Sequence, residues 1–232
     1  LINQEKFLDR WRSALESQPR PVPNPHDRLA NRKAIHQSNK GQILFIDAST
    51  PEPDQDSGSV RVTNLMHICR GLGGGVTFVA ETRAYAGKYT RDLQRTGIEV
   101  LYHPWMVSLS DFFRSRGQEF DYIVISRHYV AINYVLMLKR YCPDARFIFD
   151  TLDLHYLREL RLAELEKSRA LKMASQQTKR SELSVIKAAD ATLVVSSVEK
   201  DVLAKDAPGN RVHILSNIHY VPGRDKGFKE RK

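Results

Sequence analysis

The densest group of ionisable side chains in this sequence lies in one ten-residue segment. The segment reads Asp-Thr-Leu-Asp-Leu-His-Tyr-Leu-Arg-Glu and follows the apolar run Arg146–Phe149, which is typical of a buried strand. Carboxylates and an imidazole that converge where a strand leaves the core can orient a hydroxyl group or handle protons. The structural alternative is that Asp153 caps the next helix while the Arg and Glu form surface ion pairs. The candidate site residues of this segment are Asp150, Asp153, His155, Arg158 and Glu159.

A second candidate site follows the apolar run Ile43–Ala48. Its loop ends in Ser57-Gly58-Ser59, where a helix is predicted to begin, with Arg61 shortly after. Free backbone N–H groups and the positive end of a helix dipole favour an anion such as phosphate, and Gly58 would allow close approach to the backbone. A plain helix cap formed by Ser57 or Ser59 explains the local sequence equally well.

Several kinds of chemistry lack their sequence signature. No G-x-G-x-x-G follows a predicted strand, and the cluster 71–75 ends a predicted helix, so we interpret it as a C-cap and turn. There is no G-x-S-x-G nucleophile motif, and Cys69 and Cys142 lie in apolar helical contexts that indicate reduced, buried thiols. The histidines lack metal-ligand spacing. We therefore expect no bound metal and no cofactor.

Apolar runs alternate with helical patterns from Gly41 onward, which predicts βαβ units. The fold class is accordingly α/β, a doubly wound, mostly parallel Rossmann-like sheet of about seven strands. Such sheets bind ligands beyond the carboxyl ends of their strands, where both candidate sites and Arg127, after the run 122–126, would lie. The predicted strands are 43–48, 76–80, 98–102, 122–126, 146–149, 192–195 and 212–215. The predicted helices are 57–71, 89–96, 108–116 (capped by Ser108 or Ser110), 130–141, 156–189 and 198–205.

The N-terminal 40 residues read as an appendage to this domain. Residues 1–17 have the apolar spacing of a short amphipathic helix, and the prolines at 19, 21, 23 and 25 prevent its continuation. We predict an N-terminal helix and Pro-rich linker over 1–40, one domain over 41–221, and the start of an inter-domain linker over 222–232. The first residue is not Met, so we expect further residues upstream in the native protein.

Charge and hydropathy limit the partners. The net charge is +9 at pH 7, but along 156–190 the cations alternate with Glu159, Glu164, Glu166 and Glu182, as on a solvated helix face. Nucleic-acid binding is disfavoured, and attraction to an anionic membrane surface or a lipid-linked phosphate fits better. No apolar run reaches the roughly 18–20 residues of a membrane span, and no secretory signal is visible. We expect a cytoplasmic protein, with peripheral contact at the inner membrane face as an option.

Taken together, five segments resemble the N-terminal domain of a GT-B-fold glycosyltransferase of the family 4 kind, the large retaining group. The most specific is D-T-x-D-L-H-x-x-R-E-x-R-x-A, and the first strand and its loop P-x-P-D-x-D-S-G-S-x-R are similar to a subgroup in bacterial polysaccharide and O-antigen synthesis. The resemblance covers about Gln42 to Val221. Its five segments are 43–61, 76–100, 150–163, 189–200 and 212–217.

The resemblance implies an enzyme that moves a sugar from a nucleotide-sugar donor to a saccharide or lipid-linked acceptor in surface polysaccharide synthesis. In this family a second, C-terminal domain holds most donor contacts, so this chain alone would be inactive. His155 and Asp153 would approach the transferred sugar or acceptor hydroxyl as catalytic residues. Donor or substrate contacts would come from Ser57, Gly58, Ser59, Arg61, Arg127, Asp150, Arg158 and Glu159, and Asn217 would position the linker.

Other classes stay open at this point. A non-catalytic α/β binding module fits the fold but leaves the Asp150–Glu159 segment unexplained. A dinucleotide-dependent oxidoreductase lacks its glycine fingerprint, and a nucleic-acid-binding module rests on charge alone.

Overall fold

A single parallel sheet forms the centre of the molecule. The computed structural model describes residues 2–16, 23–24, 26–36 and 38–219. All strand pairs are parallel, in the order β3-β2-β1-β4-β5-β6-β7. The strands are β1 (Gln42–Asp47), β2 (Gly75–Ala80), β3 (Glu99–Leu101), β4 (Tyr122–Ser126), β5 (Arg146–Asp150), β6 (Ala191–Val194) and β7 (Val212–Ile214). The predicted doubly wound Rossmann-like sheet of about seven strands is confirmed.

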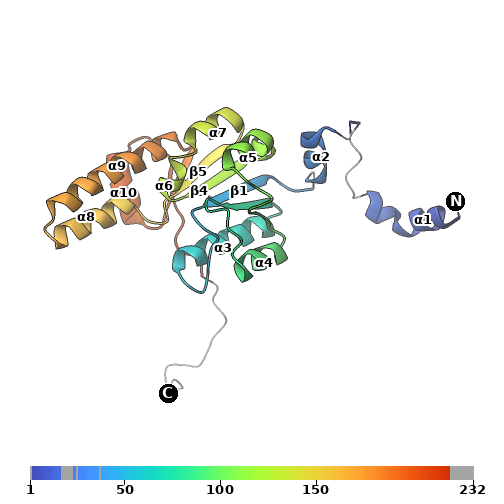
Figure 1. Ribbon diagram of the computed structural model, residues 1–232, viewed down its shortest axis with the longest axis horizontal. Coiled ribbons are helices and arrows are strands. Elements are labelled where there is room, and N and C mark those ends of the chain that lie inside the picture. The colour runs from blue at the N-terminus through green and yellow to red at the C-terminus, as the bar shows by residue number, and fades with distance from the viewer. Residues whose placement is uncertain (1, 17–22, 25, 37, 220–232) are drawn as a thin grey trace, which may run out of the picture.

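The period-2 geometry of β1 supplies both faces of the sheet. Leu44 and Ile46 point into one apolar core, and Phe45 points into the other. Helices α3 (Ser57–Gly71) and α4 (Lys88–Arg95) cover the Phe45 face, and the opposite face is covered by α5 (Leu109–Arg116), α7 (Val135–Tyr141) and α9 (Arg169–Ala188) (Figure 1). Because both faces are covered, the central strands read as continuous apolar runs.

Two predicted long helices are each divided in the structure. The helix predicted over 130–141 corresponds to α6 (His128–Ala131) and α7. The helix predicted over 156–189 corresponds to α8 (His155–Leu165) and α9. Lys167 adopts a positive φ of 50° between α8 and α9, and Ser168 then caps α9 by accepting the N–H of Leu171. The prediction of one helix was wrong because the helical periodicity continues across this turn. As a result α8 and α9 form a hairpin (Figure 1).

The N-terminal region contains α1 (Ile2–Glu16), as predicted, and an additional helix, α2 (Arg28–Ile35). Arg32 of α2 donates to Glu119 at 2.8 Å and forms an ion pair with Glu99 at 3.1 Å. Helix α2 is therefore attached to the sheet domain rather than forming part of a free linker. The predicted linker 222–232 and most of the Pro-rich stretch lie outside the described residues.

The remaining elements are a 3₁₀ turn (Gly117–Glu119) and α10 (Ser197–Asp206). Of the two predicted caps of α5, Ser108 is the one found in the structure. Both cysteines are free; Cys142 is buried, but Cys69 is only partly so. In the part of the chain that the structure describes, no helix combines the length and the apolar character needed to cross a membrane.

The strand order reverses direction between β1 and β4. In open parallel sheets this switch point opens a crevice at the carboxyl edge, where ligands bind. The segments that leave β1, β4 and β5 meet there, and these are the segments that carry the predicted site residues.

Candidate active site at the carboxyl edge of the sheet

An ion pair occupies the switch point itself. Asp47 ends β1, Arg127 follows β4, and the Arg127 Nε donates to Asp47 Oδ1 at 2.8 Å. Burial raises the pKa of Asp47, against the opposing effect of the Arg127 charge. Arg127 adopts a positive φ of 68°, a conformation that non-glycine residues rarely hold, and its side chain is 28% exposed. The switch point therefore presents a partly exposed cation whose position is fixed by Asp47.

The start of α3 carries its own carboxylate. Asp56, and neither Ser57 nor Ser59, is the N-cap, since its side chain accepts the Ser59 N–H at 2.8 Å and the Ser59 hydroxyl at 2.7 Å. The alternative of a serine cap was wrong, because the Asp56 carboxylate accepts both donors at once. Although burial acts to raise it, the pKa of Asp56 is lowered by these hydrogen bonds and by the Arg127 charge. An incoming phosphate would thus meet a helix terminus that already holds an anion.

Gly58 lies where the two predicted site loops approach each other. A Cβ at this position would lie 3.1 Å from Asp56 Oδ1 and 3.8 Å from Leu152 Cδ1, which belongs to the loop after β5. Ser57 is exposed and Ser59 is buried. Because glycine has no Cβ, position 58 leaves the Asp56 cap undisturbed where the loop after β1 approaches the loop after β5.

Arg61 and Asp150, both predicted to contact substrate, are placed in the interior as a pair. Each side chain is 1% exposed, and they form a close ion pair between α3 and the end of β5. Arg61 also donates to the carbonyl of Leu215, through Nη2 at 3.0 Å and Nε at 3.2 Å. These two residues therefore hold α3, β5 and the segment after β7 together. Their charges neutralise each other in the interior, where a ligand does not reach them.

The chain that leaves β7 runs along this carboxyl edge. Arg61 holds Leu215, and Asn64 of α3 donates to the carbonyl of Ile218 at 2.7 Å. Asn217 lies between these two anchors and is exposed. The segment 215–218 is thus fixed across the sheet edge, from β7 to the helix that follows β1 (Figure 1).

His155 lies at the first turn of α8 within a buried polar network. Its Nδ1 lies 3.1 Å from the carbonyl of Asp153 and 3.7 Å from Glu182 Oε1. Glu182, which comes from α9 and is fully buried, also accepts the backbone N–H groups of His155 at 3.4 Å and Tyr156 at 3.2 Å. The His155 side chain is only 6% exposed. The resemblance implies that His155 approaches the transferred sugar or acceptor hydroxyl, but in the structure neighbouring helices cover most of its imidazole.

Two aromatic residues of α6 complete this network. The rings of His128 and Tyr129 lie edge-on to that of His155, with centroid distances of 4.9 and 5.8 Å. His128 is buried and its Nδ1 has no hydrogen-bond partner, as is also true of the buried Oε2 of Glu159. Tyr129 is half-exposed, so it connects the network with the surface.

The two imidazoles have opposite pKa shifts. Burial alone would lower the pKa of His155, but the hydrogen bond to Glu182 and the charges of Asp153 and Glu182 outweigh it, and the net shift is upward. Burial lowers the pKa of His128, and the carboxylates around it only partly oppose this effect. The arrangement thus favours the protonated form of His155 and the neutral form of His128.

The structural alternative for this segment is confirmed for Arg158, which forms a surface ion pair, and is wrong for Asp153, which is the partner in that pair and does not cap α8. Arg158 Nη1 lies 2.8 Å from Asp153 Oδ2, with an exposed guanidinium. The two line a pocket of about 220 Å³ between α8 and α10, together with Arg161, Ser196 and Glu199. Glu199, on one side of this pocket, accepts the backbone N–H groups of Leu154 and Val195, each at 3.0 Å. This pocket adjoins the His155 network and offers guanidinium groups to an anion.

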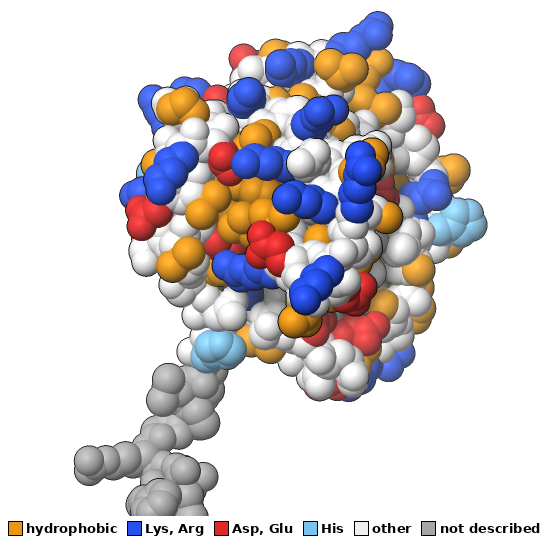
Figure 2. Space-filling model, turned by 90° about the vertical axis from the view of Figure 1, so that its left-hand side faces the viewer, with side chains coloured by type: hydrophobic (Ala, Val, Ile, Leu, Met, Phe, Trp, Pro, Cys, Tyr) orange, Lys and Arg blue, Asp and Glu red, His pale blue; other side chains and the backbone are white. Residues whose placement is uncertain are grey.

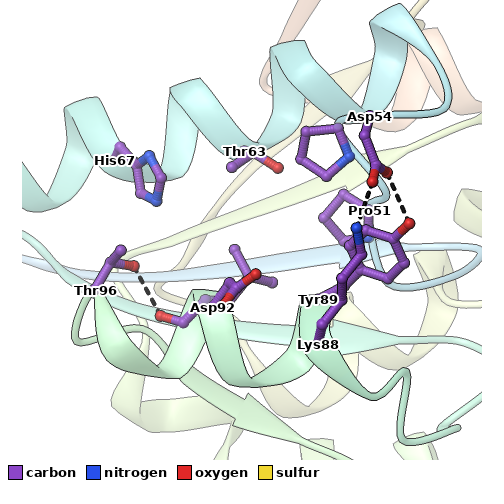
Figure 3. A pocket seen from close by; sticks show the side chains of 10 residues that line it. Pro51, Asp54, Thr63, His67, Lys88, Tyr89, Asp92 and Thr96 are labelled. Atoms are coloured by element: carbon purple, nitrogen blue, oxygen red, sulfur yellow. Dashed lines mark hydrogen bonds and ion pairs between the residues drawn. The ribbon is translucent and has the colours of Figure 1, made fainter.

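A second pocket, of about 280 Å³, lies between α3 and α4, and its residues were not singled out in the sequence (Figure 3). At one end, the Asp54 carboxylate forms an ion pair with Lys88 and accepts the Tyr89 hydroxyl at 2.7 Å. The hydrogen bonds from Lys88 and Tyr89 lower the pKa of Asp54 to about 2. These contacts fasten the loop after β1 to α4 and so limit its freedom at the site.

One group of described residues has the composition of a metal site. Ligand atoms of His128, His155 and Glu182 lie within 4.8 Å of one another. Two features oppose a metal there: both Glu182 oxygens already accept backbone N–H groups, and His155 Nδ1 is within hydrogen-bond distance of a carbonyl. That the chain binds no metal therefore stays a prediction.

Sequence reasoning missed three residues of this edge: Asp47, His128 and Glu182. A signal existed for the first two, because both flank predicted strand ends. Glu182 had none, since it was assigned to a solvated helix face and is fully buried.

Comparison with known proteins gives a fold-level result. No known sequence family matches the chain, and no curated protein matches it by sequence. Among solved structures, it is similar to HepE of Anabaena in complex with UDP (TM-score 0.50, 14% identity, 76% of this chain and 44% of the other). It is also similar to sucrose-phosphate synthase of Thermosynechococcus elongatus (0.51, 10%, 75% and 48%).

A third similar structure is Phytolacca americana UGT2, complexed with UDP-2fluoro-glucose and pterostilbene (TM-score 0.50, 10% identity, 78% of this chain and 55% of the other). This chain spans about half the length of each of these proteins. At these identities the likeness concerns the fold.

Proposed function

We propose that this chain is the N-terminal, acceptor-side half of a GT-B glycosyltransferase that uses a nucleotide-sugar donor. The observation that carries the proposal is the cation at the switch point: Arg127 is held by Asp47 at the carboxyl edge, with exposed surface remaining for an anionic ligand. The fold likeness to HepE with UDP and to UGT2 with a UDP-sugar supports the same ligand class.

The geometry suits catalysis by placement and charge rather than by a protein nucleophile. Both cysteines are free, and burial raises the pKa of each, which disfavours the reactive thiolate. Retaining transfer that uses the departing diphosphate oxygen as base needs only groups that orient and stabilise charge. Arg127 and His155 are the groups we assign to these tasks, and a polysaccharide or lipid-linked saccharide is the proposed acceptor.

A second domain would complete the site. The chain spans about half the length of the similar structures, and the resemblance assigns most donor contacts to the other half. We expect residues 1–232 alone to transfer no sugar. Turnover by this chain without a second domain would contradict the two-domain proposal.

The proposal is tested by measuring nucleoside diphosphate release from a panel of nucleotide sugars by the complete enzyme. Arg127→Ala should lower turnover by about tenfold or more, since it removes a preplaced cation from the site. Arg140→Ala, on α7 and remote from the carboxyl edge, is the matched control. Nucleotide-sugar activity equal in Arg127→Ala, Arg140→Ala and wild type would remove the switch-point cation from the mechanism.

Peripheral attachment to an anionic membrane is a second element of the proposal. One face of the molecule shows an apolar area among Lys and Arg side chains (Figure 2). That face is the α8–α9–α10 end of the molecule, where the exposed apolar residues include Leu162, Leu165, Met173 and Val198. Leu165 is 81% exposed. Such a combination favours the surface of an anionic bilayer. Sedimentation with phosphatidylglycerol vesicles, lost at high salt and reduced by Leu165→Ser, is the expected result; equal sedimentation with neutral vesicles would contradict it.

A further inference from the structure

Glu182 makes two contacts with His155 and a third with the neighbouring Tyr156. It comes from α9, 27 residues further along the chain, and it is 0% exposed. It accepts the N–H of His155 and of Tyr156, the first two residues of α8, and lies 3.7 Å from the His155 Nδ1. A carboxylate at these N–H groups caps a helix that has no cap from its own sequence, because Leu154 is in the N-cap position.

Of the remaining groups around His155, some favour protonation of its imidazole and others oppose it. Asp153, in the preceding loop, lies 3.6 Å from Nδ1, while Arg158, one turn along α8, opposes protonation. The rings of His128 and Tyr129, from α6, pack edge-on with the His155 ring. Glu182 is the one fully buried carboxylate in this set, so its charge is the least screened by water.

We propose that Glu182 is a positioning residue for His155: from α9 it fixes the imidazole at the start of α8, close to the carboxyl edge, and keeps it a hydrogen-bond donor. This inference rests on the proposed function. It assigns α9, remote in sequence from both predicted site loops, a part in the chemistry of the carboxyl edge. The upward shift of the His155 pKa agrees with the geometry.

A metal at His128, His155 and Glu182 is the competing interpretation. It would require Glu182 to give up its backbone hydrogen bonds, and it would engage the His128 Nδ1 that now has no partner. The two interpretations differ in a measurable way, because a bound metal needs neutral imidazoles whereas positioning by Glu182 favours the protonated form.

The first test uses this chain alone. Imidazole signals followed by NMR against pH should show His155 titrating above the ordinary value of 6.5. Glu182→Gln should lower that titration midpoint, Glu182→Asp should restore part of it, and Glu164→Gln, an exposed carboxylate on α8, should leave it unchanged. An unchanged His155 midpoint in Glu182→Gln would overturn the inference. So would saturable Zn²⁺ binding that raises the melting temperature of wild type but not of Glu182→Gln.

The second test uses the complete enzyme and separates this inference from the proposed function. Glu182→Gln should lower kcat by about tenfold or more with KM little changed, and should move the upper limb of the kcat–pH profile to lower pH. A normal profile and normal kcat in Glu182→Gln would overturn the positioning role while the glycosyltransferase proposal stands. A wild-type enzyme inactive on every nucleotide sugar would overturn the proposed function, whereas the titration of His155 in this chain would still test its contact with Glu182.

Discussion

Arg61 and Asp150, 89 positions apart in the sequence, form an ion pair from which water is almost completely excluded. Arg61 belongs to the helix after β1, and Asp150 ends β5. The pair joins the two sides of the switch point beneath the segment that leaves β7. The pair therefore fixes α3, the end of β5 and the segment after β7 relative to one another.

Removing one member of this pair should be severely destabilising. Arg61→Met leaves the Asp150 carboxylate buried and unpaired, which costs about 3–5 kcal/mol. Urea unfolding of this chain would measure the loss. The double variant Arg61→Met, Asp150→Leu should recover much of it, and Arg158→Met, which breaks an exposed pair, should cost less than about 1 kcal/mol. A single variant as stable as wild type would contradict the holding role.

The Asp56 cap provides a prediction for the start of α3. Asp56→Ala should cost about 1 kcal/mol of stability, and Asp56→Asn, which keeps a cap oxygen, should cost less. If the donor diphosphate approaches this helix terminus, Asp56→Asn should also lower the donor KM of the complete enzyme, since it removes a repelling charge. An unchanged or higher KM in this variant would place the diphosphate elsewhere.

Gly58 tests the same loop by steric means. Gly58→Val should reduce donor-dependent turnover far more than Ser59→Ala, because its side chain would crowd Asp56 and Leu152, where the two site loops meet. The comparison with Asp56→Ala decides the cause. Equal losses in Gly58→Val and Asp56→Ala would mean that the glycine only protects the cap, and full activity in Gly58→Val would end the case for a ligand-facing loop.

The acid limb of stability should depend on Glu99. Although burial alone would raise it, the pKa of Glu99 is lowered to about 2 by Arg116, Arg32 and the Thr77 hydroxyl. A carboxyl group whose pKa is lower in the folded state stabilises the fold above its unfolded value of 4.5, and this stabilisation is lost as the pH falls toward 2.

Unfolding free energies of wild type and Glu99→Gln between pH 6 and pH 2 would check this. The difference between them should shrink as the pH falls. Arg32→Ala should reproduce part of the change, since α2 contributes one of the guanidinium groups. A difference that stays constant with pH would show that Glu99 acts through packing instead of charge.

The alkaline limb should depend on His155 with the opposite sign. Its pKa is raised in the folded state, so its contribution is fully present below pH 6.5 and is lost as the pH rises through the folded pKa. His128, with a lowered pKa, acts in the other direction below pH 6.5. Unfolding free energies of His155→Gln and wild type, compared from pH 5.5 to pH 9, should therefore converge as the pH rises. Divergence would contradict a protonated His155.

The sheet was predictable from the pattern of the sequence. Strands buried on both faces must be continuous apolar runs, and the crossovers between them must be helical, so the alternation from Gly41 onward predicted the fold class and the edge at which ligands bind. It also located the segments around Gly58, Arg127 and His155 at that edge, because each directly follows a strand.

The roles of the individual polar residues, in contrast, became clear from the folded structure. Asp56, and not the alternative Ser57 or Ser59, caps α3 because its carboxylate accepts two donors. Arg61 is buried, and not exposed to a ligand, because it pairs with Asp150 in the interior. Glu182 lies in a helix whose alternating charges read as solvated, yet the turn at Lys167 folds that helix back against α8 and buries the carboxylate beside His155. Charge pairing across 27 to 89 residues depends on distances in space, which local patterns do not encode.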